Sequence, residues 1–182
     1  MSNTLQEFDT IVGICKDLFI KKMHDYGVAW RIMRLPSITD QIYIKAQRIR
    51  SIEEKGTHKI DEGTYSEFIG IINYAVMAQI QLTLSPAAIE NSNMPENEVV
   101  DLYNSYVQKA KKLLSNKNHD YDEAWRNMHI SSITDIILMK ILRIKQIENL
   151  NQQTIASEGI DANYYDIFNY AVFALIKLTP LK

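Results

Sequence analysis

Two lysine–arginine pairs occupy corresponding places in this chain, Lys45 with Arg48 and Lys140 with Arg143. Residues three apart share one face of a helix, and here that face is apolar and lies opposite a polar one. A buried cation without an opposite charge costs several kcal/mol, so each pair needs a partner. Carboxylates of a neighbouring helix can supply it, or the long stems can reach the rim of the fold. The alternative is a phosphate site, in which guanidinium and ammonium groups bind an anionic ligand.

The second half of the chain carries acidic residues that could hold a metal. Asp166 lies on an apolar helix face, where a carboxylate needs either a cation or a metal ion. Arg143 is one candidate partner. Mg²⁺ is the other, because it takes oxygen ligands from one or two carboxylates together with substrate phosphates. Glu158 and Asp161 stand at the start of the same predicted helix, and with Asp166 they form the candidate Mg²⁺ site.

The two halves differ in these acidic residues but share an asparagine. Asn169, three residues after Asp166, is matched by Asn73 in the first half. At four positions the second half is acidic and the first is not: Asp122, Glu123, Asp161 and Asp166 stand in place of Gly27, Val28, Tyr65 and Gly70. Several carboxylate oxygens are needed for a divalent cation, so metal binding is expected in the second half only. Anion binding by the basic pairs is expected in both halves.

The sequence HDY-x-x-AWR occurs once in each half and combines an imidazole, a carboxylate, two aromatic rings and a guanidinium. Such rings and an arginine in a loop can hold a base by stacking while the charge reaches a phosphate. The rings can equally fasten the loop to the rest of the fold by packing. Neither histidine has a second histidine or cysteine at metal-ligand spacing, which argues against zinc. The ten residues are His24, Asp25, Tyr26, Trp30, Arg31, His119, Asp120, Tyr121, Trp125 and Arg126.

These residues repeat because the chain is a tandem duplication. Residues 24–53 and 119–148 are identical at 17 of 30 positions without a gap, whereas chance predicts roughly two. A shift of one further residue aligns the Asn-Tyr-Ala-Val sequences that begin at Asn73 and Asn169. Many of the retained residues are polar, so the two copies share a polar constellation as well as a core.

The spacing of apolar residues predicts three helices in each half, with an irregular segment at HDY-x-x-AWR. Ser-Ile-Thr-Asp at 37–40 and at 132–135 has the form of a capping box, which accounts for Asp40 and Asp135. The expected helices are 5–23, 37–54 and 64–82 in the first copy and 98–114, 132–149 and 161–178 in the second. The expected units are the first repeat at 1–83, a linker at 84–97 and the second repeat at 98–182.

The fold class expected from this pattern is all-α. A three-helix unit of about 85 residues buries only a modest core, so the two copies should pack together. The result would be a six-helix bundle with a pseudo-two-fold axis. Its second and third helices are nearly continuous in apolar character and should lie at the centre.

Composition excludes several classes of function. The net charge of −2 provides no broad attraction to duplex nucleic acid or to anionic membranes. A single cysteine, Cys15, excludes an internal disulfide, and the N-terminus has no signal core, so a cytoplasmic location is expected. No apolar run reaches the length of a membrane span. Nucleotide-binding P-loop, dinucleotide-fold, nucleophile-elbow and zinc-protease motifs are missing.

The chain resembles the nucleotide modification associated domain 1 family of bacteria and phages, in a tandem form. The resemblance rests on Asp-Tyr-Gly at 25–27, the helical Lys-x-x-Arg, and E-G-x₆-D-x-x-N-Y-A at 158–171. It departs from the family pattern at Ile44 and Met139, where an acidic residue is expected, and at Gly70. The resemblance implies a role in nucleotide or DNA-base modification. The helical architecture is more distantly similar to the MazG-like nucleotide pyrophosphohydrolases, which bind Mg²⁺ through paired carboxylates.

Two functions are therefore expected from the sequence. The first is a nucleotide-handling protein that binds phosphates at the basic pairs and Mg²⁺ at the acidic residues, and acts in modification or hydrolysis. The second is a non-catalytic helical module that binds a nucleotide or a partner protein, with its ion pairs serving only the structure. A homo-oligomer is compatible with either.

Overall fold

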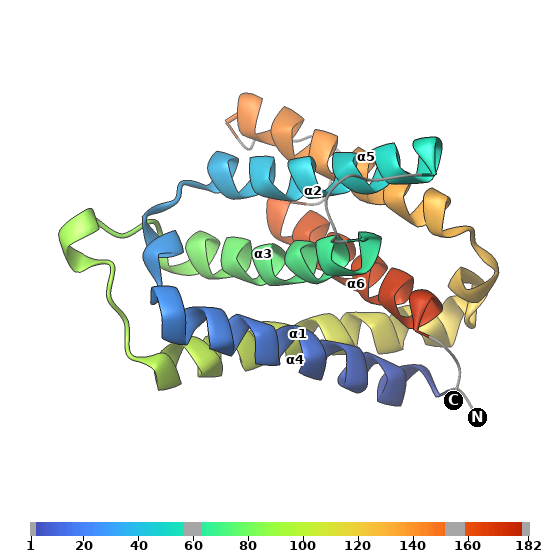
Figure 1. The fold of residues 1–182 in the computed structure, drawn as a ribbon, viewed down its shortest axis with the longest axis horizontal. Helices are drawn as coiled ribbons and strands as arrows, with labels where there is room; N and C mark the ends of the chain where they lie inside the picture. Colours follow the sequence, from blue (N-terminus) through green and yellow to red (C-terminus); the bar gives the residue numbers. More distant parts are fainter. Residues whose placement is uncertain (1–2, 57–62, 152–158, 180–182) are drawn as a thin grey trace.

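The computed structural model describes residues 3–56, 63–151 and 159–179. All the regular structure in these residues is helical, which confirms the predicted all-α fold (Figure 1). The six α-helices are α1 Thr4–Tyr26, α2 Leu35–Lys55, α3 Thr64–Leu84, α4 Glu96–Tyr121, α5 Ile130–Asn149 and α6 Ile160–Leu178. Three short 3₁₀ helices connect them: η1 Ala29–Ile32, η2 Ile89–Asn91 and η3 Ala124–Asn127.

The helices form three layers of two (Figure 1). Helices α3 and α6 lie in the middle, between the pair α2 and α5 and the pair α1 and α4. The prediction that the second helices share the centre is wrong, because α2 has five buried residues and α3 has twelve. Helix α3 is apolar and long enough to cross a membrane, but most of it is buried inside the bundle, as in an ordinary core helix.

Reciprocal ion pairs between α2 and α5 show the pseudo-two-fold relation of the copies. Lys145 Nζ of α5 lies 2.6 Å from Asp40 Oδ1 of α2. Arg50 Nη1 of α2 lies 3.8 Å from Asp135 Oδ1 of α5. The second pair is the first with the two copies exchanged. The sequence indicated that both aspartates cap their helices. In the structure they join the two copies instead.

The ends of the helices differ from the prediction in both copies. HDY is helical, because α1 continues to Tyr26 and α4 to Tyr121, and only AWR forms a separate 3₁₀ turn. The capping boxes are also wrong: α2 and α5 begin two residues before Ser37 and Ser132, and no side chain caps either helix. In the first copy Pro36 fits the first turn of α2, where the missing N–H costs nothing.

The residue after each HDY provides a stability test, because its backbone has positive φ in both copies. Gly27 has φ 63° and ψ −144°, and Asp122 has φ 52° and ψ −146°. This region is almost confined to glycine and costs other residues about 1–3 kcal/mol. We expect Asp122→Gly to raise the free energy of unfolding by about 1 kcal/mol, as measured by urea denaturation, and Gly27→Asp to lower it. An Asp122→Gly variant that is less stable than the natural protein would contradict backbone strain at Asp122.

Candidate functional site

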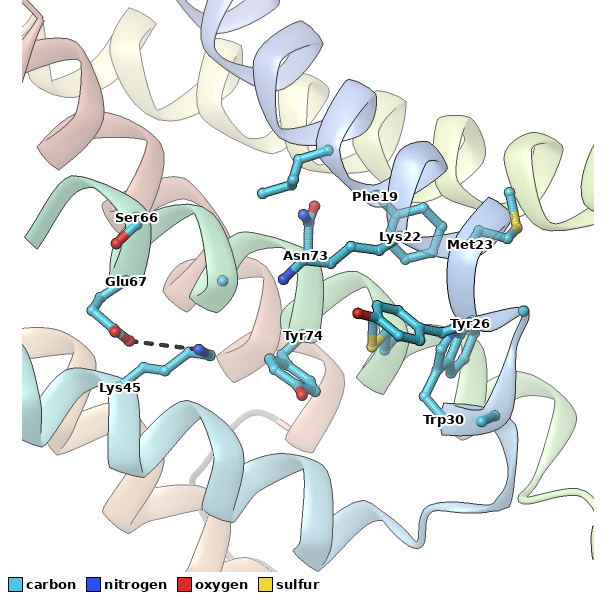
Figure 2. Close-up of a pocket in the computed structure, with 15 residues that line it drawn as sticks. Phe19, Lys22, Met23, Tyr26, Trp30, Lys45, Ser66, Glu67, Asn73 and Tyr74 are labelled. Carbon is cyan, nitrogen blue, oxygen red and sulfur yellow. Dashed lines mark ion pairs between the residues drawn. The ribbon is translucent and has the colours of Figure 1, made fainter. Parts of the chain in front are cut away.

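A cavity of about 390 Å³ lies in the first copy, between α1, η1, α2 and α3 (Figure 2). It brings together residues from three of the repeated motifs: HDY-x-x-AWR, Lys-x-x-Arg and Asn-Tyr-Ala-Val. Tyr26 ends α1, Trp30 lies in η1, Lys45 lies on α2, and Asn73 and Tyr74 lie on α3, and all five line the cavity. The volume is within the lower range for small-molecule sites. We call this cavity the first-copy pocket.

The charged residues of the first-copy pocket carry an excess of positive charge. Arg48 Nη1 lies 2.6 Å from Glu67 Oε1, and Lys45 Nζ lies 3.5 Å from Glu67 Oε2. Glu67 is 8% exposed, so it is a buried carboxylate shared by the predicted basic pair. Lys22 of α1 adds a further cation to the wall of the pocket. Glu67 of α3 thus pairs with both cations of the predicted pair, and the residues that line the pocket include two lysines and one carboxylate.

In the second copy the corresponding lysine is bound by a different carboxylate. Asp166 Oδ2 lies 2.8 Å from Lys140 Nζ, and Asp166 Oδ1 lies 2.7 Å from Lys117 Nζ. Burial raises the pKa of Asp166, but the hydrogen bonds and charges of the two lysines outweigh it, and the net pKa is below the usual value. Arg143 is exposed, and Lys117 stands where the sequence indicated Arg143 as the partner.

The carboxylate has moved by one helical turn between the copies. Glu67 on α3 is replaced by Asn163 on α6, and Gly70 on α3 is replaced by Asp166 on α6. Asn163 turns back to its own helix, where its Nδ2 donates to the carbonyl of Gly159 at 3.0 Å. In each copy a carboxylate of the third helix therefore binds the lysine of the second helix, but at a different height.

Sequence reasoning missed Lys22, Lys117 and Glu67. The two lysines were detectable, because each stands two residues before the histidine of HDY. Extending the comparison of the copies by two residues would have included both. Comparison of the copies could not reveal Glu67, because its counterpart in the second copy is an asparagine, Asn163.

The shared asparagines join helices and explain part of the repeat. Asn73 Nδ2 donates to the carbonyl of Cys15 at 3.1 Å, and Tyr103 Oη donates to Asn73 Oδ1 at 2.8 Å. Asn169 Nδ2 donates in the same way to the carbonyl of Ala110 at 3.1 Å. Both asparagines are buried, and each fastens the third helix of its copy to the first. Asn73 also reaches the wall of the first-copy pocket.

The two tryptophans have different surroundings. Trp125 is 5% exposed and stacks on Phe173, with 4.3 Å between ring centroids and 5° between the planes. The guanidinium of Arg126 lies 4.4 Å above the same ring. Trp30 is only partly buried, lies 6.3 Å from the ring of Phe19, and faces the first-copy pocket. Packing therefore accounts for Trp125, whereas the ring of Trp30 forms part of the pocket wall.

The arginines of AWR serve the structure in both copies. Arg31 is buried, donates to the carbonyl of Ser85 at 3.0 Å, and has its pKa lowered by that burial. Arg126 instead forms ion pairs with Glu7 at 2.5 Å and with Glu123 at 2.7 Å. Hydrogen bonds from Arg126 to both carboxylates raise its pKa. Neither arginine lines the first-copy pocket.

The remaining residues of HDY lie on the surface. His24 Nε2 is 3.3 Å from Glu96 Oε1, and His119 Nδ1 is 3.1 Å from Asp120 Oδ1. Tyr26 and Tyr121 are about equally exposed, but Tyr26 forms the rim of the first-copy pocket. Asp25 and Asp120 are exposed as well.

The predicted Mg²⁺ site is only partly within the described residues. Glu158 lies outside them, and Asp161 is exposed at the start of α6. Within residues 3–56, 63–151 and 159–179, no three histidine, cysteine or acidic side chains gather closely enough to hold a metal. Asp166, with a lysine at each oxygen, does not fit a metal ligand as it stands. Mg²⁺ binding through Glu158 and Asp161 stays a prediction.

The fold and the pocket together define a class: a duplicated three-helix unit whose first copy holds a pocket with aromatic walls and two lysines. The chain belongs to the nucleotide modification associated domain 1 family, which it matches over residues 22–82 and again over residues 117–178. The two matches confirm the resemblance to this family and its tandem form. No curated protein and no solved structure matches the chain. The similarity to MazG-like enzymes stays an expectation.

Proposed function

We propose that the protein binds a nucleotide in the first-copy pocket. The observation that supports this is the gathering of aromatic rings and cations around one cavity, from segments far apart in the sequence. Trp30, Tyr26 and Tyr74 offer faces on which a base can stack, and stacking is worth about 1–3 kcal/mol per base. Lys45 and the excess positive charge suit the phosphate. The family's description, which links it to nucleotide modification, favours the same ligand.

We place this binding within a wider activity. That activity is either nucleotide or DNA-base modification or hydrolysis assisted by Mg²⁺. No step of the proposal depends on a metal held by the protein. A panel of ribonucleotides and deoxynucleotides, assayed with Mg²⁺ or Mn²⁺ for released phosphate or pyrophosphate, tests hydrolysis. Turnover that disappears in Lys45→Gln would support an active first copy. Binding without turnover would argue against hydrolysis, and would leave modification or a purely binding role as the function of the protein.

The non-catalytic alternative suits the second copy. Lys140, Asp166 and Lys117 satisfy one another there, and Trp125 is closed off by Phe173. The ion pairs of that copy serve the structure in this proposal, and the second copy acts as a scaffold for the first. Turnover or ligand binding that depended on Lys140 at unchanged stability would contradict this division.

Tryptophan fluorescence separates the copies, because each contains one tryptophan. We expect nucleotides to change the emission of Trp30, which lines the first-copy pocket, and to leave that of buried Trp125 unchanged. Titration of a Trp125→Phe variant should therefore keep the signal, and titration of Trp30→Phe should lose it. Trp30→Ala should also weaken binding by about tenfold or more, as expected for loss of one stacking contact. A signal carried by Trp125 alone would contradict the proposal.

A further inference from the structure

The two copies differ where two lysines approach their third helix. In the second copy Lys117 of α4 and Lys140 of α5 bind one carboxylate, that of Asp166 on α6. The corresponding residues of the first copy are Lys22 of α1 and Lys45 of α2, and Gly70 of α3 stands in place of Asp166. The lysines are retained and the carboxylate between them is absent.

The first-copy pocket lies beside Gly70. Lys22, Lys45 and Gly70 all line it, and in Figure 2 the side chains of the two lysines extend toward each other from α1 and α2. A Cβ added at Gly70 would come within 2.7 Å of Lys45 Cε and 2.8 Å of its Cδ. The stem of Lys45 therefore lies across the bare backbone from which, in the second copy, the aspartate side chain projects.

The charges of the first copy are also less well matched. Lys45 Nζ is 3.5 Å from Glu67, whereas Lys140 Nζ is 2.8 Å from Asp166. The closer partner of Glu67 is Arg48, at 2.6 Å. Lys22 forms no ion pair with any residue that the structure describes. Two ammonium groups thus border a cavity where their counterparts share an aspartate.

We infer that the carboxylate of Asp166 stands in for an anionic group of the ligand that the first copy binds. In the first-copy pocket an oxyanion lies beside Gly70 and the stem of Lys45, where Lys22 and Lys45 both donate to it, as Lys117 and Lys140 donate to Asp166. The oxyanion is a phosphate of the nucleotide, so this inference rests on the proposed function and assigns its phosphate subsite. In the second copy the carboxylate of Asp166 is the anion between the two lysines, so no phosphate of a ligand binds there.

Filling the subsite tests the inference. Gly70→Asp moves the flexible stem of Lys45 aside and places a carboxylate beside Lys22 and Lys45. We expect it to weaken binding of 5′-nucleoside monophosphates at least 100-fold, while circular dichroism shows that the helical fold is retained. Lys22→Gln should weaken binding by about 10- to 100-fold, the usual effect of losing a charged hydrogen bond. Lys21→Gln is the matched control, since Lys21 is exposed on the same helix and does not line the pocket. Unchanged nucleotide binding in Gly70→Asp and Lys22→Gln would overturn the inference and leave the proposed function standing.

Removing the carboxylate of Asp166 from the second copy provides the reverse test, which does not depend on nucleotides. Asp166→Gly should lower the melting temperature in chloride buffer, and inorganic phosphate at equal ionic strength should restore much of the loss. Asp9→Gly is the control, because it removes an exposed aspartate bound to Lys111 at 2.7 Å. Equal effects of phosphate on the two variants would overturn the inference. Rescue of Asp166→Gly with no nucleotide binding to the natural protein would support the anion subsite and refute the nucleotide.

Discussion

Trp125→Ala is expected to lower the free energy of unfolding by about 3–5 kcal/mol, the usual cost of removing a buried aromatic ring. Trp125 is 5% exposed, stacks on Phe173 and lies beneath the guanidinium of Arg126, so its loss leaves a cavity that three groups border. Urea denaturation at neutral pH, followed by circular dichroism, measures the change.

Trp30→Ala is the control for this experiment. Trp30 has the same place in the repeat but borders the first-copy pocket, so part of its ring is already next to open space. We expect its removal to cost about half as much or less, in proportion to the smaller buried area. Equal losses in the two variants would mean that the copies pack alike, which would contradict the asymmetry described above.

Asp166→Asn is expected to destabilise the protein by about 3 kcal/mol at neutral pH, near the lower end for breaking a buried ion pair. The side chain of Asp166 is 13% exposed and that of Lys140 is 14% exposed, so an uncompensated ammonium would remain in a mostly buried place. Lys117 is far more exposed and reaches water easily, which limits the loss. Asp40→Asn breaks an exposed pair with Lys145 and should cost less than about 1 kcal/mol.

The pH dependence of the same variant separates an ion pair from a metal ligand. The lysines lower the pKa of Asp166, so its contribution is present above the unfolded pKa of about 3.9 and disappears as pH falls through the lower folded value. The difference between Asp166→Asn and the natural protein should therefore be full at pH 7 and shrink in strong acid. Were Asp166 a metal ligand among carboxylates, Asp166→Asn in chelator would be as stable as the natural protein or more so.

Much of the fold follows from sequence alone. The duplication follows from the identity of residues 24–53 and 119–148. The six helices follow from apolar spacing, and the packing of the copies follows from the small core that one copy could bury. The helix ends do not follow, because HDY carries no strong breaker and continues the preceding helix until positive φ at Gly27 or Asp122 ends it. The position of α2 at the outside depends on packing across the bundle, and helix periodicity does not report it.

The site was predictable only in part. The position of Lys45 and Arg48 on an apolar face correctly indicates that their charges need a partner, and Glu67 is one. Which carboxylate it is depends on the height at which neighbouring helices cross, and this height differs by one turn between the copies. The sequence also favours the second copy for metal binding because it is richer in acidic residues, and it predicts anion binding in both copies. The structure uses two of these acidic residues, Glu123 and Asp166, in internal ion pairs, and the first copy contains the pocket described above.

The central claim is that one chain binds one nucleotide, in the first copy. Isothermal titration calorimetry of the natural protein with 5′-nucleoside monophosphates, and with the same titration repeated on Gly70→Asp, measures the number of sites directly. The account predicts one site per chain in the natural protein and none in Gly70→Asp. Two sites per chain, or a single site that persists in Gly70→Asp, would contradict it.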